Sequence, residues 1–515
     1  MKQNKFQVLI VGGGPCGLMA ALLLGKSGIR TVVLEKHPGI SHHPKAMGVT
    51  RRTAEIYRQL GLLEKMQEGG LRHPCQAVST WSRGGLVGEL LGSAPLLEDD
   101  PRFSPCGRFH CAQPHNEAVL LEAAGACESV EIRFQTRALE FSQDADAVTV
   151  VCENPDGSTE TLQGDYLIAA DGDRSPIREK LGIQREGPGE LGRFLSVYFR
   201  ADYRQHLEGR LALIANTIGD NFFEVFVTVN GDDLWLMHHF LDERETPADW
   251  PLERLHAEVV KASGLPETPV EILSISPWVM SPSIAPEWRR GRIFLVGDAA
   301  VRVSPSGGLG LNNGIQGVHN LAWKLAAVLR GEEPESLLET YQTERLAASK
   351  FTFENSGNNA GEIYEIVTAA FSGDWEKTRA LIAQSRRTGS GSGQDFGIVY
   401  DSADIIPDAT REVAPVDPVN VYIPQARPGH RAPHVWVESG GQRVSLLDFY
   451  GGGFTLLCGQ EGNPESFPLP SRHARVVREG VDFKDPENYW RIVYGIGRGG
   501  FVLVRPDGYV SARVR

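Results

Sequence analysis

Three glycines near the start of the chain have the spacing of a turn that binds a dinucleotide. Gly12, Gly14 and Gly17 follow an apolar run of strand length at residues 6–11 and open a segment, residues 17–28, with apolar residues at helical spacing. Gly12 allows a tight turn, Gly14 allows close approach to a pyrophosphate, and Gly17 allows the helix to pack on the strand. Because a helix N-terminus offers free N–H groups and partial positive charge, the sequence predicts an anionic diphosphate here.

An acidic residue follows at the distance expected for ribose recognition. A second apolar run, residues 31–34, ends at Glu35, where a carboxylate would accept hydrogen bonds from a ribose diol. Residues 495–500 repeat the glycine spacing, but a strand-like run, residues 501–504, follows them instead of a helix. We therefore predict a hairpin turn at residues 495–500 and one Rossmann turn, at Gly12.

Two later segments complete the pattern of an FAD site. The first, residues 169–175, reads AADGDRS, and the second reads GDAA at residues 297–300 followed by SPSGGLGLNNG at residues 304–314. Together with the glycine turn, these segments predict a single FAD site assembled from distant parts of the chain.

Composition and charge limit the class of protein. The 515 residues carry a net charge of −13, with 41% hydrophobic and 23% charged residues, which is typical of a globular enzyme of several domains. We expect no nucleic-acid or membrane partner, because basic stripes are missing and the apolar residues 8–25 are interrupted by the glycine turn. The seven cysteines have no metal or disulfide spacing, so we expect a reducing, cytoplasmic location and no metal site.

The order of predicted elements indicates several domains. Four strand-like runs predict an antiparallel sheet inserted into the nucleotide-binding domain, at residues 194–199, 211–215, 222–229 and 234–241. Residues 70–110 are rich in glycine and proline, which predicts a loop near that sheet. The predicted domains are an FAD-binding domain in two parts, residues 1–185 and 286–395, a sheet domain for substrate, residues 186–285, and a C-terminal domain, residues 396–515.

With these motifs the chain resembles the class A flavoprotein monooxygenases, the para-hydroxybenzoate hydroxylase-like aromatic hydroxylases. The segments that carry the resemblance are residues 11–17, 44–48, 52–55, 165–182 and 291–314, with Gln113. Within this family it is similar to the longer members that act on phenols and polycyclic natural products. The resemblance implies an α/β fold: a Rossmann-type FAD-binding domain, an inserted antiparallel-sheet substrate domain and, after a polar linker at residues 385–393, a thioredoxin-like C-terminal domain.

The resemblance also implies which residues bind FAD. Lys45 takes a place beside the phosphates where arginine is usual, Gln113 matches a ribityl contact, and Asp171 belongs to an Asp-Gly pair associated with both FAD and NAD(P)H. The backbone amides of Leu311 and Asn312 would point at the flavin ring, where a preorganised pair of dipoles favours the anionic reduced ring. The complete predicted set is Gly12, Gly14, Pro15, Cys16, Gly17, Glu35, Lys36, Lys45, Ala46, Arg52, Gln113, Asp171, Gly172, Asp298, Pro305, Gly310, Leu311 and Asn312.

The implied reaction is hydroxylation of an aromatic ring. NADH or NADPH reduces the flavin, O2 adds to it, and the flavin C4a-hydroperoxide transfers oxygen to an electron-rich, polycyclic or polyketide-like substrate while the protein excludes water. The same cofactor chemistry would also serve Baeyer–Villiger oxidation, epoxidation or oxidative decarboxylation. An alternative of another class is a catalytically inactive FAD-binding scaffold.

We expect the substrate on the inserted sheet, against the flavin. A phenol reacts faster as phenolate, so a base would help, and His238 or His239 is the candidate. Arg51 or Arg52, at the start of the helix after the Lys45 loop, would hold substrate or nicotinamide, and Arg52 and Pro305 complete the candidate catalytic set. The predicted substrate contacts are Phe223, Phe226, Trp235, Met237 and His238. We expect a monomer or a homodimer, with the C-terminal domain in packing or oligomer contacts.

Overall fold

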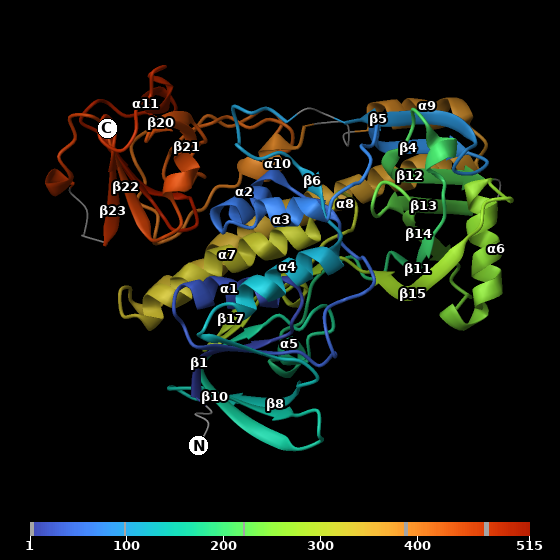
Figure 1. The fold of residues 1–515 in the computed structure, drawn as a ribbon, viewed down its shortest axis with the longest axis horizontal. Coiled ribbons are helices and arrows are strands. Elements are labelled where there is room, and N and C mark those ends of the chain that lie inside the picture. The colour runs from blue at the N-terminus through green and yellow to red at the C-terminus, as the bar shows by residue number, and fades with distance from the viewer. Residues whose placement is uncertain (1–4, 97–98, 220–221, 386–389, 468–472) are drawn as a thin grey trace.

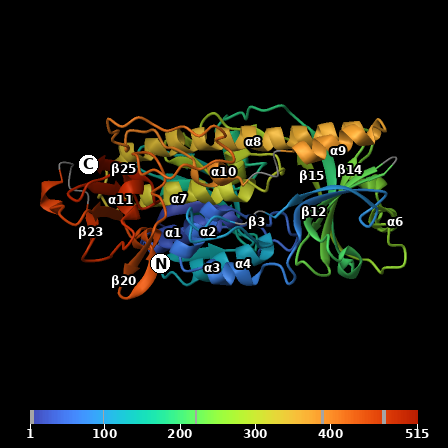
Figure 2. The same cartoon turned by 90° about the horizontal axis from the view of Figure 1, so that it is seen from above.

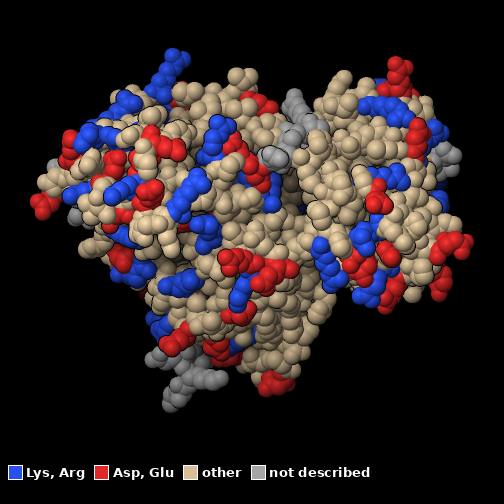
Figure 3. All heavy atoms as spheres, turned by 45° about the horizontal axis from the view of Figure 1, so that its top comes forward, with Lys and Arg blue, Asp and Glu red and all other residues tan. Residues whose placement is uncertain are grey.

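The computed structural model describes residues 5–96, 99–219, 222–385, 390–467 and 473–515. Within these ranges the chain forms three sheets of four or more strands, and each belongs to a different part of the molecule in Figure 1. The first sheet lies low in the centre of that view, the second on the right and the third on the left. Among the described helices, none combines the length and the apolar character that crossing a membrane requires. On the face shown in Figure 3, basic and acidic side chains are interspersed.

The first sheet is mostly parallel. Its strands are β1 (Lys5–Val11), β2 (Thr31–Leu34), β7 (Val130–Arg133), β8 (Arg137–Gln143), β9 (Val148–Glu153), β10 (Thr159–Ala169), β17 (Arg289–Arg290) and β18 (Ile293–Leu295). The order is β17-β18-β10-β1-β2-β7, with β8 and β9 extending β10 as an antiparallel arm. Because both faces are covered, β2 and β18 are fully buried, and their residues are apolar except for Thr31.

Helices surround this sheet and build most of the predicted FAD-binding domain. They are α1 (Pro15–Lys26), α2 (Arg51–Gln59), α3 (Leu63–Glu68), α4 (Gln113–Gly125), α5 (Pro176–Lys180), α7 (Gly310–Leu329) and the first part of α8 (Glu339–Phe371). Short strand pairs join the loops between them: β3 (Gly48–Val49) with β6 (Phe109–His110), and β16 (Ser283–Ile284) with β19 (Val301–Arg302). Helix α1 packs between α4 and α7. Helix α9 (Trp375–Gln384) follows α8 and packs on the second sheet instead.

The contact between α1 and α7 depends on two glycines. A Cβ added to Gly314 of α7 would lie 2.5 Å from the sulfur of Cys16, and one added to Gly297 would lie 2.8 Å from it. Real Cβ atoms essentially never come closer than 3.0 Å to another heavy atom. The helices therefore approach this closely because both positions lack a side chain.

Gly314→Ala should lower the free energy of unfolding by about 1 to 3 kcal/mol, because the new methyl group overpacks the contact with Cys16. The double variant Cys16→Ala/Gly314→Ala should recover most of that loss, measured by urea unfolding of both singles and the double. Gly317→Ala is the matched control on α7, because its Cβ would meet Arg345 Nε at an ordinary 3.7 Å. Equal destabilisation by Gly314→Ala with and without the cysteine would contradict the packing explanation.

The second sheet contains the four strands predicted from the sequence and three more. Its strands are β4 (Ala77–Arg83), β5 (Glu89–Pro95), β11 (Gly192–Arg200), β12 (Ala212–Gly219), β13 (Phe222–Thr228), β14 (Leu234–Leu241) and β15 (Glu271–Met280). The order is β15-β11-β14-β13-β12-β4-β5, and every pair is antiparallel except β12 with β4.

The expectation of a loop at residues 70–110 is wrong for β4 and β5, which form one edge of this sheet. The register between them shifts at Ala77/Ser79 and again at Trp81/Ser82. Such bulges break the alternation of apolar and polar residues by which a strand is recognised in sequence. Gly84 and Gly85, with φ of +81° and +120°, belong to the turn between the two strands, whereas Gly92 lies within β5.

Helices cover both faces of the second sheet. On one face Leu255 of α6 (Leu252–Ser263) packs in a core with Phe226 and Trp235. On the other face Ile366 of α8 packs with Trp81 and Ile218. Figure 2 shows α8 running from the side of the C-terminal domain to this sheet, so a single helix connects the two parts that would hold cofactor and substrate.

The third sheet forms the C-terminal domain. The elements are α10 (Ser392–Phe396), β20 (Trp436–Ser439), β21 (Gln442–Ser445), β22 (Phe454–Cys458), β23 (Ala474–Arg478), α11 (Tyr489–Tyr494), β24 (Phe501–Val504) and β25 (Val510–Val514). The order β23-β22-β24-β25, with β22 parallel to β23 and the others antiparallel, is the thioredoxin-like arrangement expected. Residues 386–389 of the predicted linker lie outside the described residues.

A buried cluster of charges fastens the C-terminal domain to α7 and α8. Glu344 of α8 accepts hydrogen bonds from Arg505 Nη1 at 2.6 Å and from Lys324 Nζ of α7 at 2.8 Å, and all three side chains are fully buried. Asp507 pairs with the same Arg505. Burial opposes ionisation of Glu344, but Arg505 and Lys324 outweigh it and hold its pKa well below the usual range. The charges are thus paired within one network that spans two domains.

Candidate cofactor and substrate site

The predicted pyrophosphate turn joins β1 to α1. A Cβ added to Gly12, whose φ is +107°, would lie 2.2 Å from the carbonyl oxygen of Ala170, and one added to Gly17 would lie 1.9 Å from the oxygen of Gly12. A Cβ at Gly14 would meet no described atom within 4 Å. Among the described residues no side chain caps α1. The turn therefore leaves room beside Gly14 at a helix N-terminus, as an incoming phosphate requires.

Glu35 is held at the end of β2 by backbone groups. One carboxylate oxygen accepts a hydrogen bond from Gly13 N at 2.6 Å and the other from His37 N at 2.8 Å. The side chain is almost completely buried. These bonds bring the carboxylate against the glycine turn, where a ribose would lie next to a pyrophosphate.

The two later motifs are fastened to each other by arginines. Arg178 Nη1 donates to the carbonyl oxygens of Asp173 and Ala299, at 3.1 and 3.4 Å. Arg185 donates to the carbonyl oxygens of Asp173 and Asp298, at 2.6 and 3.2 Å. The segments around residues 171 and 298, which are far apart in sequence, are therefore adjacent at the ends of β10 and β18.

Both predicted aspartate ligands have altered pKa values. Burial raises the pKa of Asp171, whose Oδ1 is buried with no hydrogen-bond partner among the described residues. Burial and the neighbouring Asp173 raise the pKa of Asp298. An unpartnered carboxylate oxygen of Asp171 and the nearby carboxyl group of Asp298, both beside a glycine turn, fit a ligand that carries hydroxyl groups, as FAD does.

The Lys45 loop closes this site from another side. Gln113 N donates to Ala46 O at 2.8 Å, and its Nε2 donates to Glu117 at 2.6 Å. Glu117 also accepts a hydrogen bond from Ser41 N at 2.7 Å. Burial raises the pKa of Glu117 and Asp298, and the positive charge of Lys45 opposes the rise in both. Lys45 therefore lies electrostatically close to several of the predicted ligands.

The side chain of Asn312 fixes the start of α7. Its Oδ1 accepts from Thr50 N at 2.9 Å, and its Nδ2 donates to the carbonyl oxygens of Gly48 and Gly308, at 2.9 and 2.8 Å. The first turn of α7, which begins at Gly310, is thus tied to β3. The exposed Pro305 lies in the loop before it.

The two faces of β14 have different surroundings. Phe226, Trp235 and Met237 lie in the core between the second sheet and α6. The expectation that these three contact substrate is corrected, because strand alternation turns them away from the Lys45 loop. Phe223 lies on the opposite face but stacks on Trp81, with ring centroids 6.0 Å apart, beneath α8.

His239 belongs to the α6 face as well. Its Nδ1 lies 2.6 Å from Glu224 Oε1, and its ring lies against Trp250 with centroids 3.9 Å apart. The candidate base His239 is therefore corrected to a core residue. Burial raises the pKa of Glu224 to about 7, with the His239 hydrogen bond opposing the rise.

His238 lies on the face that meets the Lys45 loop. Ser196 is its neighbour on β11, and Trp278 packs edge-on against its ring at 5.7 Å. From the loop, His43 binds Ser274 Oγ through Nδ1 at 2.8 Å and Ser196 Oγ through Nε2 at 3.0 Å. Burial and then His43 lower the pKa of His238 to about 4, and its buried Nδ1 has no partner among the described residues.

Comparison with known proteins agrees with this geometry. The family described as FAD binding domain matches residues 5–356, and the family described as aromatic-ring hydroxylase, C-terminal, matches residues 425–515. The chain belongs to the FAD-dependent aromatic-ring hydroxylases. The predicted family, fold class and FAD cofactor are thereby confirmed, and this hydroxylase is an FAD-dependent monooxygenase. The scaffold and the other oxygenations are not favoured.

Individual relatives match the hydroxylase over its whole length. It is 33% identical to tetracenomycin A2 monooxygenase-dioxygenase of Streptomyces glaucescens, covering 100% of this chain and 94% of the relative. It is 34% identical to aklavinone 12-hydroxylase RdmE of Streptomyces purpurascens, covering 100% and 96%. Among solved structures, the flavin-dependent monooxygenase PieE in complex with FAD and substrate superposes with a TM-score of 0.92, at 29% identity over 99% of this chain and 96% of that one.

Arg51 and Arg52 of the hydroxylase bind groups outside the predicted cofactor and substrate site. Arg52 donates to Glu55 at 2.9 Å and to the carbonyl oxygen of Asp507 in the C-terminal domain at 2.6 Å. Arg51 pairs with Asp395 at 2.7 Å. Both side chains are buried. The expectation that one of them holds substrate or nicotinamide, and that Arg52 binds FAD, is corrected to a role in packing the C-terminal domain on α2.

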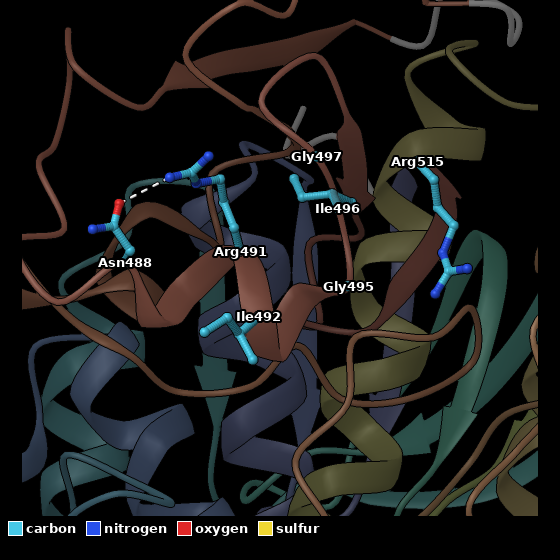
Figure 4. Close-up of a pocket in the computed structure, with 7 residues that line it drawn as sticks. All are labelled: Asn488, Arg491, Ile492, Gly495, Ile496, Gly497 and Arg515. Carbon is cyan, nitrogen blue, oxygen red and sulfur yellow. Dashed lines mark hydrogen bonds between the residues drawn. The ribbon is translucent and has the colours of Figure 1, made fainter.

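The second glycine match is not a nucleotide turn. Residues 495–500 follow α11 and precede β24, so they join a helix to a strand and not two strands of a hairpin. Gly495, Ile496 and Gly497 line an open hollow of about 580 Å³, in which Asn488 accepts a hydrogen bond from Arg491 (Figure 4). The predicted strand after the glycines is present, while the predicted hairpin is wrong.

His43, Ser196 and Ser274 were missed by the sequence analysis. His43 lies two residues before Lys45 in a loop with no secondary-structure pattern, and its partners are 153 and 231 residues away. No local sequence pattern connects a histidine to two such distant serines. The one signal in the sequence was that His43 lies close to the predicted ligand Lys45.

Glu224→Gln should raise the free energy of unfolding at pH 8 by on the order of 1 to 3 kcal/mol and change it little at pH 4.5. The reason is that the carboxyl ionises near pH 4.5 when unfolded but near 7 when folded, so the wild type loses stability as pH rises between these values. Urea unfolding at several pH values measures this. The exposed Glu253→Gln on α6 controls for loss of a carboxylate, and an equal effect of Glu224→Gln at both pH values would contradict the assignment.

Proposed function

We propose that the hydroxylase adds one oxygen atom of O2 to a phenolic ring of a polycyclic, polyketide-like substrate bound between the Lys45 loop and the His238 face of the second sheet. The observation that carries this proposal is the buried, unpartnered Nδ1 of His238 beside Trp278 and His43. A polar atom without a partner on an aromatic surface suits a flat ring that carries a hydroxyl group. Similar proteins are named for tetracenomycin and aklavinone, and these names support a polycyclic substrate.

The overall reaction balances with a nicotinamide reductant. The substrate C–H, O2, NAD(P)H and a proton give the substrate C–OH, water and NAD(P)+. Bound FAD supplies the redox chemistry. The residues of this chain bind the cofactor through the turn at Gly12 to Gly17, orient the phenol and keep water out.

His238 suits orientation of the phenol better than its deprotonation. A phenol has a pKa of about 10, whereas that of His238 is lowered to about 4. Complete proton transfer between them would be uphill by on the order of 8 kcal/mol. A neutral imidazole nitrogen can instead donate to or accept from a phenolic hydroxyl, whichever tautomer it has.

The purified protein should be yellow, and a panel of polycyclic phenols should include compounds that accelerate NAD(P)H oxidation and gain one oxygen atom. Absorbance at the nicotinamide band and product mass are the measurements. A protein that remains colourless after incubation with FAD, or oxidation that no aromatic compound stimulates, would contradict the proposal.

His238→Phe should raise KM for the phenolic substrate roughly tenfold, since it keeps a ring against Trp278 but loses one hydrogen bond. The analogue that has hydrogen in place of this hydroxyl group is the control, because it can neither donate to nor accept from His238 and should bind wild type and variant about equally. The pH profile of kcat should have the same shape in wild type and variant between pH 5 and 9, because His238 stays neutral throughout this range. If kcat of the wild type falls toward low pH within this range and kcat of the variant does not, His238 acts as a base.

A further inference from the structure

His43 bridges two parts of the hydroxylase that are far apart in sequence. Its ring belongs to the loop after β2, and its two nitrogens bind Ser274 on β15 and Ser196 on β11. Its ring also packs edge-on against Tyr198, with centroids 6.1 Å apart. Both hydrogen-bonding positions of the imidazole are therefore committed to the second sheet.

The link from His43 to Lys45 is short and stiff. Pro44, the only residue between them, is buried, and its ring fixes its own φ and restricts His43 to extended backbone. The position of the His43 ring on the sheet therefore determines where the Lys45 backbone lies.

The loop is also anchored on the side of the FAD-binding domain. Ser41 N donates to Glu117, Gln113 N donates to Ala46 O, and Cys111 N donates to Met47 O. These bonds hold the ends of the segment, whereas His43 and Pro44 hold its middle. A segment fixed at three places has one conformation only while all three anchors are in place.

We propose that His43 is a positioning residue, which clamps the Lys45 loop onto the second sheet and so places Lys45 for the phosphates of FAD. It acts through the two serine hydroxyls and does not touch the reacting atoms. Burial and then Lys45 lower the pKa of His43 to about 4, so the ring is neutral and has one donor and one acceptor for the pair of hydroxyls.

One consequence is a thermodynamic link between cofactor and substrate. Ser196 is the cross-strand neighbour of His238, so the clamp ends on the surface proposed to hold substrate. A ligand that favours the clamped sheet also favours the placed loop, and coupling between two ligands is reciprocal. This consequence rests on the proposed function, whereas the clamp itself does not.

FAD affinity of the apoprotein tests the clamp without any turnover. His43→Phe keeps the ring packing on Tyr198 but loses both hydrogen bonds, and should raise the Kd for FAD roughly tenfold, measured by quenching of flavin fluorescence. Ser196→Ala/Ser274→Ala should reproduce that change, and adding His43→Phe to it should change Kd little further. Ser276→Ala is the matched control on the same face of β15, because its side chain makes no hydrogen bond within the described ranges.

A double-mutant cycle with Lys45 identifies what the clamp acts on. If His43 works by placing Lys45, His43→Phe should weaken FAD binding much less in the Lys45→Ala background than in the wild type. Full additivity of the two changes, or an unchanged Kd in the double serine variant, would overturn the proposal. The thermal midpoint of each variant separates a displaced loop from global unfolding.

The outcomes distinguish the clamp from the proposed substrate. A clamp phenotype in FAD binding, in a protein that no phenol stimulates, would leave the clamp standing and remove the substrate proposal. If the protein hydroxylates a phenol but His43→Phe leaves its FAD affinity unchanged, the substrate proposal stands and the clamp is overturned.

Discussion

The cofactor site depends on the close approach of backbone segments around the start of α1. A Cβ at Gly12 or Gly17 would lie within 2.2 Å of a carbonyl oxygen, and one at Gly297 or Gly314 would press on Cys16. The segments around residues 12–17, 170, 297 and 314 thus meet closely at positions that have no side chain of their own. Dispersion and backbone hydrogen bonds hold them together, so the space left beside Gly14 has a defined shape. The predicted FAD ligands Glu35, Asp171 and Asp298 lie on segments that meet at this point.

Helix α8 and the buried charge cluster connect this region to the C-terminal domain and to the second sheet. Isolated buried charges are costly, but the carboxylates of Glu344 and Asp507 balance the cations of Lys324 and Arg505 through short hydrogen bonds, and removing any one of the four would leave an excess of the opposite charge buried. The cluster therefore favours one placement of the C-terminal domain on α7 and α8. Farther along, α8 packs on the second sheet through Ile366. One continuous helix therefore connects the C-terminal domain and the first part of the molecule to the second sheet.

The sequence was sufficient for features that local chemistry determines. The glycine turn, Glu35 and the Asp-Gly motif each require particular residue types at fixed spacing, and the structure brings them together. The strands β4 and β5 were missed because bulges interrupt their alternation. The face of a strand that meets the cofactor could not be deduced either, because alternation separates Phe226 from Phe223 without saying which face α6 covers. That choice is a property of tertiary packing.

The adjacent histidines 238 and 239 show how one strand gives the same side chain two roles. Strand alternation points His239 into the α6 core, where Glu224 occupies its Nδ1, and points His238 toward the Lys45 loop, where His43 is its neighbour. Beside His239, the carboxyl group of Glu224 titrates in the neutral range, and its ionisation lowers the free energy of unfolding. His238 has no such partner, and burial keeps its ring uncharged at the same pH. Glu224, which titrates in the neutral range, and the surface proposed to hold the phenol therefore lie on opposite faces of one sheet. A change in pH can alter the free energy of unfolding of this sheet without changing the charge of that surface.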